Sequence, residues 1–242
     1  MPARVHFFWT GPDFAYADFL AVRTAQAVHR PDAVWVWTGV APQNNPHWEN
    51  LLRLDQVEIK PITPHLIPGT NRFILSDYVR YRVLYLHGGL YLDFDTISLK
   101  PLVRKPERSV LAGEESPGIL NIAVLDVAAG SVVLQNLLEA CQQRLAAIRD
   151  VDRPFNMLGP GLFTSACRAH PEEMDIMPPE VFYPIHWKNW QLVWANCILP
   201  DTTRILHYWG SYGHDRASRV LPGQREKTTY HHAVSSVLGD DW

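Results

Sequence analysis

Two aspartates separated by one residue, Asp93 and Asp95, are the residues best placed to do chemistry in this sequence. They follow three strand formers at residues 90–92, and successive strand side chains point to opposite faces. We therefore expect both carboxylates on one side and Phe94 on the other. Two like charges held together repel, so one must take up a proton or a cation. Oxygen ligands of this kind suit Mg²⁺ or Mn²⁺ carrying a diphosphate, whereas an isolated D-x-D is also common as a solvated acidic turn.

The segment that delivers these aspartates is predicted to be a helix that ends at two glycines. Ser76 suits its N-cap, and apolar or aromatic residues recur after it at helical spacing. Asp77 and Arg80 then lie one turn apart on a shared face, while Gly88 and Gly89 end the helix. An exposed ion pair of small energetic consequence is the alternative interpretation of Asp77 and Arg80.

The whole stretch, residues 76–95, reads S-D-Y-V-R-Y-R-V-L-Y-L-H-G-G-L-Y-L-D-F-D and resembles the signature of the DxD sugar-binding glycosyltransferases. That family includes the yeast-type initiating mannosyltransferases, related galactosyltransferases and the glucosylating domains of large clostridial toxins. The resemblance implies an α/β GT-A fold, a UDP- or GDP-sugar donor, a Mn²⁺ or Mg²⁺ ion and transfer with retention. It also implies that Asp93 and Asp95 bind the metal. Asp77 then contacts the donor through ribose or sugar hydroxyls, and Arg80 contacts its sugar or phosphate.

Strands and helices are predicted to alternate along the first hundred residues. Strands are expected at residues 5–9, 34–38 and 57–62, and helices at residues 13–30 and 47–54. This order favours a mostly parallel sheet with its ligand crevice beyond the carboxyl ends of the strands. Trp9 and Thr10 end the first strand. By resemblance, Trp9 stacks on the nucleotide base and backbone near Thr10 reads the base edge; a core position is the alternative for Trp9.

The second half of the chain is expected to form the acceptor side. Strands are predicted at residues 109–113 and 119–127, and a helix at residues 132–148. The run I-L-N-I-A-V-L-D resembles an asparagine-bearing strand of the family, which makes Asn121 a candidate hydrogen-bond partner of the transferred sugar. Residues 158–164 resemble a T-G-P turn that opens a helix, so the backbone of Gly159 could meet an oxygen-rich ligand.

The run R-I-L-H-Y-W-G-S-Y at residues 204–212 resembles the family's terminal H-x-W-x-x-S-W block. By this resemblance His207, at the end of a strand, completes the metal shell or contacts the diphosphate; a purely structural histidine is the alternative. Trp209, Ser211 and Tyr212 are expected in a flexible loop that closes over the donor. Further loops are expected at residues 63–71, 96–108 and 178–184.

The composition indicates one ordinary globular domain. Of 242 residues, 47% are hydrophobic and 19% charged, enough apolar material for a substantial core. The net charge of -3 gives no electrostatic signature of nucleic-acid binding. We expect a single GT-A-like domain over residues 1–242, with residues 1–100 as the nucleotide-sugar half and residues 101–242 as the acceptor half and closing loop.

The expected location is the cytoplasm, with peripheral contact to the inner face of the membrane left open. Cys141, Cys167 and Cys197 lie far apart, which fits neither a disulfide framework nor a C-x-x-C site. Neither a signal-peptide pattern nor a membrane-spanning apolar run stands out.

The function expected from the resemblance is metal-dependent, retaining transfer of a hexose from a nucleotide-diphosphate sugar to a saccharide or glycolipid acceptor, in surface polysaccharide synthesis. Two alternatives stay open. A metal-dependent hydrolase would cleave the same nucleotide sugars without an acceptor, and a silent binding protein would hold them without turnover.

Overall fold

A seven-stranded sheet forms the centre of the computed structural model, which describes residues 2–62, 72–149, 154, 156–224, 226–240 and 242. Its strands are β1 (Arg4–Trp9), β2 (Ala33–Thr38), β3 (Val57–Pro61), β4 (Gly89–Leu92), β6 (Val110–Ser116), β7 (Ile119–Val127) and β8 (Met174–Met177). They lie in the spatial order β3-β2-β1-β4-β7-β6-β8. Only β7 is antiparallel to its neighbours β4 and β6, and the other pairs are parallel. The expected α/β class with a mostly parallel sheet is confirmed.

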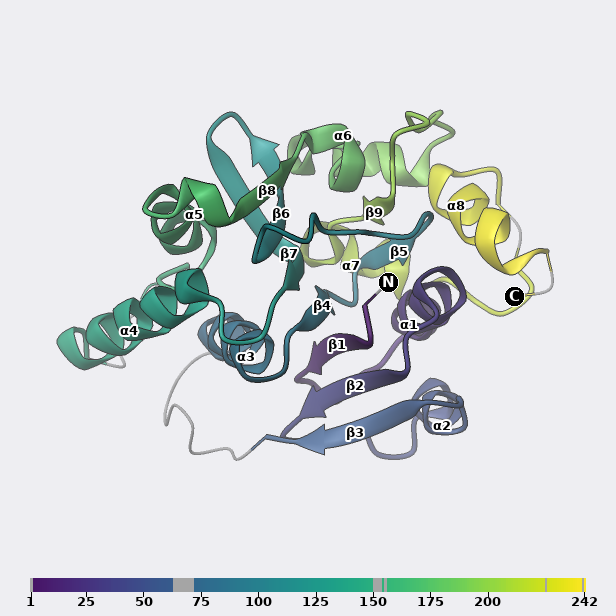
Figure 1. Ribbon diagram of the computed structural model, residues 1–242. Coiled ribbons are helices and arrows are strands. Elements are labelled where there is room, and N and C mark those ends of the chain that lie inside the picture. Colours follow the sequence, from purple (N-terminus) through teal and green to yellow (C-terminus); the bar gives the residue numbers. More distant parts are fainter. Residues whose placement is uncertain (1, 63–71, 150–153, 155, 225, 241) are drawn as a thin grey trace.

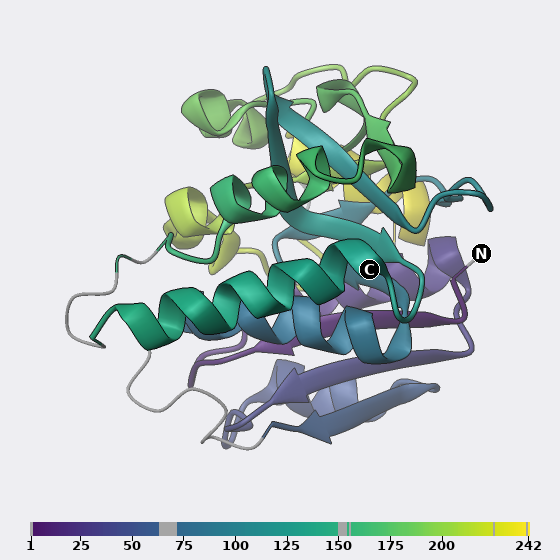
Figure 2. The ribbon, with the colours of Figure 1, turned by 60° about the vertical axis from the view of Figure 1, so that its left-hand side comes forward.

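Helices cover both faces of this sheet (Figure 1). One side carries α3 (Arg72–His87), α4 (Val132–Ala147) and α5 (Pro160–Arg168), and the other carries α1 (Tyr16–His29), α2 (Pro46–Leu52) and α8 (Thr229–Leu238). Figure 2 shows α3 and α4 side by side in front of the strands. Neighbouring residues of β1 lie in different hydrophobic cores. Phe7 packs in one buried cluster and Phe8 packs in the other. The central strands are therefore apolar on both faces, as parallel strands between helical layers must be.

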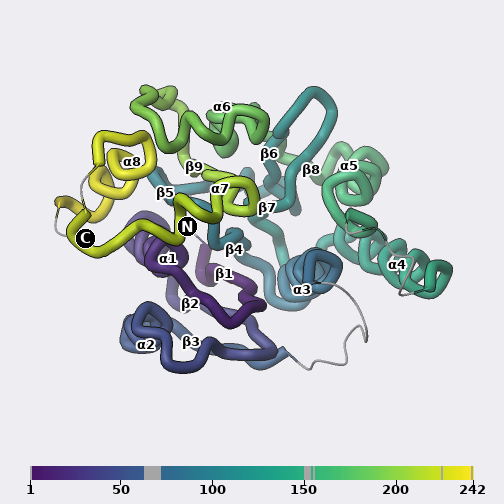
Figure 3. Tube along the Cα trace, turned by 180° about the vertical axis from the view of Figure 1, so that it is seen from behind, coloured from purple at the N-terminus to yellow at the C-terminus, as the bar shows by residue number. Residues whose placement is uncertain are grey.

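A small second sheet pairs a strand from the middle of the chain with a strand from its C-terminal region. The strands β5 (Thr96–Ser98) and β9 (Ile205–His207) pair antiparallel, with Thr96 opposite His207. Short helices precede and follow β9, namely η3 (Pro171–Glu173), α6 (Pro179–Phe182), η4 (Trp187–Trp194) and α7 (Gly210–Ala217). Figure 3 shows α8 in yellow beside α1 in purple, so the C-terminal region packs on the first helix.

Most predicted elements exist, with several differences in detail. The helix before the aspartates extends back to Arg72, so Ser76 lies inside it rather than at its N-cap. The first helix, predicted from residue 13, begins only at Tyr16 as α1. Its N-cap is Ala15, whose N–H donates to the carboxylate of Asp18 at 2.7 Å.

Three of the predicted loops contain helices or strands, and a fourth lies outside the described residues. Residues 96–108 contain β5, and residues 178–184 contain α6, where Pro179 occupies a first-turn position that tolerates proline. The expected flexible segment at Gly210 and Ser211 is instead the first turn of α7. The loop predicted at residues 63–71 lies outside the described residues.

The cysteines behave as small apolar residues. Cys141 and Cys167 are buried, Cys197 is half-buried, and all three are free thiols. Burial raises the pKa of Cys141 and of Cys167 to about 12, so neither is a reactive thiolate. Among the helices in the described part of the chain, none has both the length and the apolar character needed to cross a bilayer.

Candidate active site

Asp93 and Asp95 occupy a turn directly after β4 rather than the strand itself. The hydroxyl of Thr96 closes the turn by donating to the carbonyl of Asp93 at 2.7 Å. Phe94 faces away from the carboxylates and packs in the core, 4.8 Å from Phe7 between ring centroids. The two carboxylates do share one side, as predicted, but a turn rather than strand alternation places them there.

Asp95 is held by two groups from the C-terminal region. Nε2 of His207 lies 3.0 Å from one carboxylate oxygen, and the N–H of Gly210 donates to the other at 2.8 Å. A Cβ on Gly210 would stand 2.9 Å from the Cβ of Asp95, so this close approach needs glycine. Burial alone would raise the pKa of Asp95, but the charge and hydrogen bond of His207 hold it below its usual value. Burial alone would lower the pKa of the His207 imidazole, but the charge and hydrogen bond of Asp95 raise it above its usual value.

Arg80 organises the other aspartate from inside α3. Its Nη1 donates to Asp93 at 3.0 Å and to the carbonyl of Ile122 at 2.8 Å. Its Nη2 donates to Ser76 at 2.8 Å and lies 3.5 Å from Asp77. The guanidinium is only 5% exposed, which rules out the alternative of a solvated surface ion pair. Arg80 therefore joins the helix, the aspartate turn and β7 in one network.

Burial also shifts the two acids that Arg80 contacts. It raises the pKa of Asp93, with Asp95 adding to the rise and Arg80 opposing it. It raises the pKa of Asp77 to about 7, again against the nearby Arg80. Tyr91 donates its hydroxyl to Asp93 at 3.0 Å. Arg80 alone thus does not offset the cost of ionising these buried acids, which favours an additional cation beside them.

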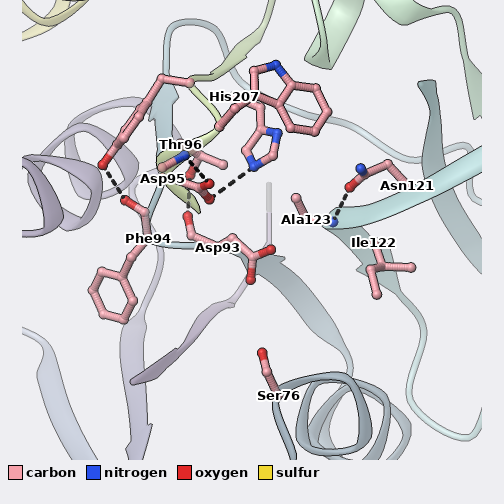
Figure 4. A network of polar contacts seen from close by, with 12 residues as sticks. Ser76, Asp93, Phe94, Asp95, Thr96, Asn121, Ile122, Ala123 and His207 are labelled. Atoms are coloured by element: carbon pink, nitrogen blue, oxygen red, sulfur yellow. Dashed lines mark hydrogen bonds and ion pairs between the residues drawn. The ribbon is translucent and has the colours of Figure 1, made fainter. Parts of the chain in front are cut away.

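Asp93, Asp95 and His207 could supply that cation's ligands. Each offers one ligand atom, and these atoms all lie within 4.8 Å of one another (Figure 4). Two carboxylate oxygens and one imidazole nitrogen fit Mn²⁺, whereas Mg²⁺ prefers oxygen alone. The residues present therefore fit the divalent metal that the sequence predicts.

Two cavities meet at Asp93 and Asp95. The smaller cavity, about 550 Å³, contains Trp9 and Thr10 in its wall. The larger cavity measures about 960 Å³. Among the predicted site residues, its wall contains Asp77, Arg80, Asn121, Gly159, His207, Trp209 and Tyr212. Ser211 borders both cavities, so every predicted site residue lies on one or both of them.

Their local surroundings refine what each can do. The indole N–H of Trp9 donates to the carbonyl of Gly11 at 2.9 Å, and the ring edge packs on Phe14, so Trp9 is part core and part cavity wall. Gly159 is the N-cap of α5, as predicted. Trp209 is buried beside His207, with ring centroids 4.1 Å apart, and belongs to the support of the histidine. The roles of these residues toward a ligand stay predictions.

Two residues in the wall of the larger cavity, Glu115 and Trp187, were not among the predicted site residues. Glu115, on β6, projects into it, and Trp187 of η4 stacks on Tyr212 with centroids 5.6 Å apart and planes at 19°. The only sequence signal for Glu115 is its position near the end of a strand. For Trp187 the only sequence signal is its spacing from the tryptophans that follow it, and a buried helix explains that spacing as well as a ligand site does.

Comparison with known proteins agrees with this geometry. A family model, the glycosyltransferase sugar-binding region containing a DXD motif, matches residues 28–116. Residues 28–116 thus resemble the sugar-binding region of the DXD glycosyltransferases. The match covers β2 through β6, including α3, the aspartate turn and Glu115. Asn121 and His207 lie beyond it, so their place beside the aspartates comes from the structure.

Two relatives among curated proteins share this region. Lactosylceramide 4-alpha-galactosyltransferase of Rattus norvegicus is 29% identical over 205 residues, which cover 72% of this chain and 52% of the relative. The same enzyme of Homo sapiens is 28% identical over 209 residues, covering 72% of this chain and 53% of the relative. The chain thus spans about half the length of these two relatives.

Solved structures identify the fold. The galactosyltransferase LgtC, determined with donor and acceptor sugar analogues, is 14% identical with a TM-score of 0.51, and the match covers 97% of this chain and 96% of LgtC. The PaToxG glycosyltransferase is 17% identical with a TM-score of 0.52 over 70% of each chain. The chain therefore has a GT-A fold, as expected, and the region that matches the DXD family model lies within it.

Proposed function

We propose that this protein is a metal-dependent, retaining glycosyltransferase that moves a hexose from a nucleotide-diphosphate sugar to a saccharide or glycolipid acceptor. The observation that carries the proposal is that Asp93 and Asp95, with His207 within ligand distance of both, lie where two cavities meet. A nucleotide sugar has a diphosphate in its middle and unlike groups at its ends. A metal-binding cluster with a cavity on each side matches that order of parts.

The smaller cavity is proposed to hold the nucleotide. Its wall combines the aromatic side chains Phe8, Trp9 and Phe14 with polar groups such as Asn45. Aromatic faces stack on any nucleobase, and stacking is worth about 1 to 3 kcal/mol per base. This cavity suits a uridine or a guanosine diphosphate.

The larger cavity is proposed to hold the transferred sugar and the acceptor. At about 960 Å³ against about 550 Å³, it has room for more than one ligand group. Tyr212, 54% exposed and stacked on Trp187, offers an aromatic surface for the apolar face of a saccharide. A hydrolase needs no such second site, so this surface favours transfer over hydrolysis.

The side chains around the aspartates have definite tasks in this scheme. Asp93, Asp95 and His207 would hold the ion, and a bound Mn²⁺ or Mg²⁺ would supply positive charge against the leaving diphosphate. Arg80 orients Asp93 and opposes the rise of its pKa, and the N–H of Gly210 orients Asp95. Retention is proposed by front-face attack. The bond from the anomeric carbon to the diphosphate breaks, the acceptor oxygen bonds on the same face, and a phosphate oxygen takes the acceptor proton.

Galactose is the first sugar to test, because the curated relatives are named as galactosyltransferases of lactosylceramide. That name also supports a saccharide or glycolipid acceptor, and with it a role in building surface glycans. A cytoplasmic site of action is part of the same proposal, supported by three free thiols.

The test is a thermal-shift screen of UDP- and GDP-sugars, each with and without Mn²⁺. One class of nucleotide sugar should raise the melting temperature only with metal, and Asp93→Asn with Asp95→Asn should abolish the rise. Asp215→Asn is the matched control, because Asp215 is an exposed aspartate on α7.

Product analysis with lactose then completes the assignment. A galactosylated product supports the transferase, and free sugar alone would replace it with the hydrolase. The absence of any metal-dependent shift, for every donor, would refute a nucleotide-sugar site altogether.

A further inference from the structure

Glu115 is an ionisable residue of the larger cavity that the scheme above does not use. It lies on β6 close to the hairpin that leads into β7, where the strand register is irregular. The irregularity gives two adjacent glutamates different surroundings. Glu114 accepts the N–H of Gly118 at 2.6 Å within the hairpin, whereas Glu115 faces the cavity that contains Asp93 and His207.

Asn121 fixes the direction of this carboxylate. Its side-chain oxygen accepts the N–H of Ala123 at 2.7 Å, which sets the orientation of the amide (Figure 4). Its side-chain nitrogen donates to Oε2 of Glu115. Asn121 is only 7% exposed, so both bonds are sheltered from water. Among the described residues, no other hydrogen bond reaches the Glu115 carboxylate, and Oε1 is left for a ligand.

The charge of Glu115 decides what kind of ligand it can accept. Glu115 shares the wall of the larger cavity with Asp93, Asp95 and His207. A carboxylate here repels the phosphates of a donor and accepts hydrogen bonds from neutral hydroxyls. Since the diphosphate belongs beside the metal ligands, the hydroxyls that reach Glu115 come from the sugar.

We propose that Glu115 accepts hydrogen bonds from the hydroxyls of the transferred sugar and that Asn121 is the residue that positions it. This inference rests on the proposed function and deepens it. It moves the main sugar contact from Asn121, one of whose amide hydrogens is already used within the protein, to the carboxylate that this amide orients.

The decisive comparison is between a nucleotide sugar and its own nucleotide. The protein is titrated by calorimetry, with Mn²⁺ present, against the nucleotide sugar that gives the largest thermal shift and then against the parent diphosphate. Glu115→Gln should weaken binding of the sugar nucleotide about 10-fold and leave binding of the diphosphate unchanged, because a hydrogen bond to a charged group is lost. Asn121→Ala should show the same pattern at smaller size.

Glu114→Gln is the matched control, since it changes the same side chain one residue away and outside the cavity. It should change neither affinity. Melting temperatures without ligand verify that all variants fold.

The outcomes separate this inference from the function on which it rests. If the wild type binds neither ligand with metal, the proposed function fails. If the wild type binds both, two results refute the role of Glu115. One is that Glu115→Gln keeps the wild-type difference in affinity between the sugar nucleotide and the diphosphate. The other is that the wild type itself shows no such difference in affinity. A loss of turnover of about 1000-fold with an unchanged difference would instead assign Glu115 to bond breaking and refute the positioning role.

Discussion

The smaller and larger cavities share the aspartate turn but are built in different ways. The smaller one is formed by the end of β1, the loop behind it, the start of α1 and part of the C-terminal region, and its wall includes the aromatic rings of Trp9 and Phe14. The larger one is assembled from α3, β6, β7, α5 and the C-terminal region, and its wall carries the charged groups Asp77, Arg80 and Glu115. Under the proposed function, we expect aromatic contacts to hold the nucleotide in the smaller cavity and charged groups to hold the sugar in the larger one. Substitutions in the two should therefore have separable effects.

The largest effect is expected among the charged groups of the larger cavity, from Arg80→Met. The substitution leaves Asp77 and Asp93 buried without their shared cation, which should cost about 3 to 5 kcal/mol of unfolding free energy. Urea denaturation measures this loss. Metal-dependent nucleotide-sugar binding should disappear as well, since Asp93 loses its orienting donor.

Arg82→Met supplies the matched control for Arg80. Arg82 is exposed on the same helix, so its loss should change stability by no more than about 0.5 kcal/mol. Equal destabilisation by the two substitutions would show that the network around Arg80 has no special role and would break the contrast between the cavities.

The next effect concerns Asp18, an acid in the wall of the smaller cavity. Burial raises the pKa of Asp18 to about 7 from an ordinary value of 3.8, and no described residue forms an ion pair with it. The folded protein therefore binds this proton more tightly than the unfolded chain, and its contribution to stability falls as the pH rises from about 4 to about 7. Asp18→Asn still accepts the N–H of Ala15 and abolishes this loss.

Stability curves at several pH values measure this effect. The variant should equal the wild type near pH 3 and exceed it by about 4 kcal/mol above pH 7, with unchanged discrimination between nucleotide sugar and nucleotide. A difference that does not depend on pH would contradict the assigned pKa.

How much of this could be predicted depends on how local each feature is. The alternation from β1 to β3 follows from short apolar runs, and the approach of Asp77, Arg80 and Asp93 follows from one helix, two glycines and one turn. Both were correct in outline. Only the family resemblance indicated that His207 lies near the aspartates. Local patterns could not indicate it, because the pairing of β5 with β9 joins strands about a hundred residues apart.

Features set by tertiary contacts were missed. Gly210 and Ser211 are typical loop residues, yet they begin α7, after Trp209 adopts a left-handed φ of 57° that its neighbours stabilise. The direction of Glu115 depends on irregular pairing between β6 and β7, which no alternation of residue types indicates. Composition and spacing carry no information about either.

A smaller effect is expected from Trp9→Ala in the smaller cavity. Loss of base stacking should weaken nucleotide diphosphate and nucleotide sugar by the same factor, corresponding to about 1 to 3 kcal/mol. Calorimetry with both ligands tests this equality, and Trp9→Phe should recover part of the loss. If only the sugar nucleotide is affected, Trp9 does not lie on the nucleotide side.

The smallest effect tests whether the acceptor belongs to the larger cavity. Tyr212→Ala removes an exposed ring from the stacked pair with Trp187, so the KM for a saccharide acceptor should rise threefold to tenfold, about 1 kcal/mol. The KM for the donor should not change, and Tyr212→Phe should behave as the wild type because it keeps the ring. Combined with Trp9→Ala, the two losses should add, since the residues serve different ligands on different cavities. A donor KM that rises with the acceptor KM in Tyr212→Ala would mean that this ring covers the donor, and the division of ligands between the cavities would have to be redrawn.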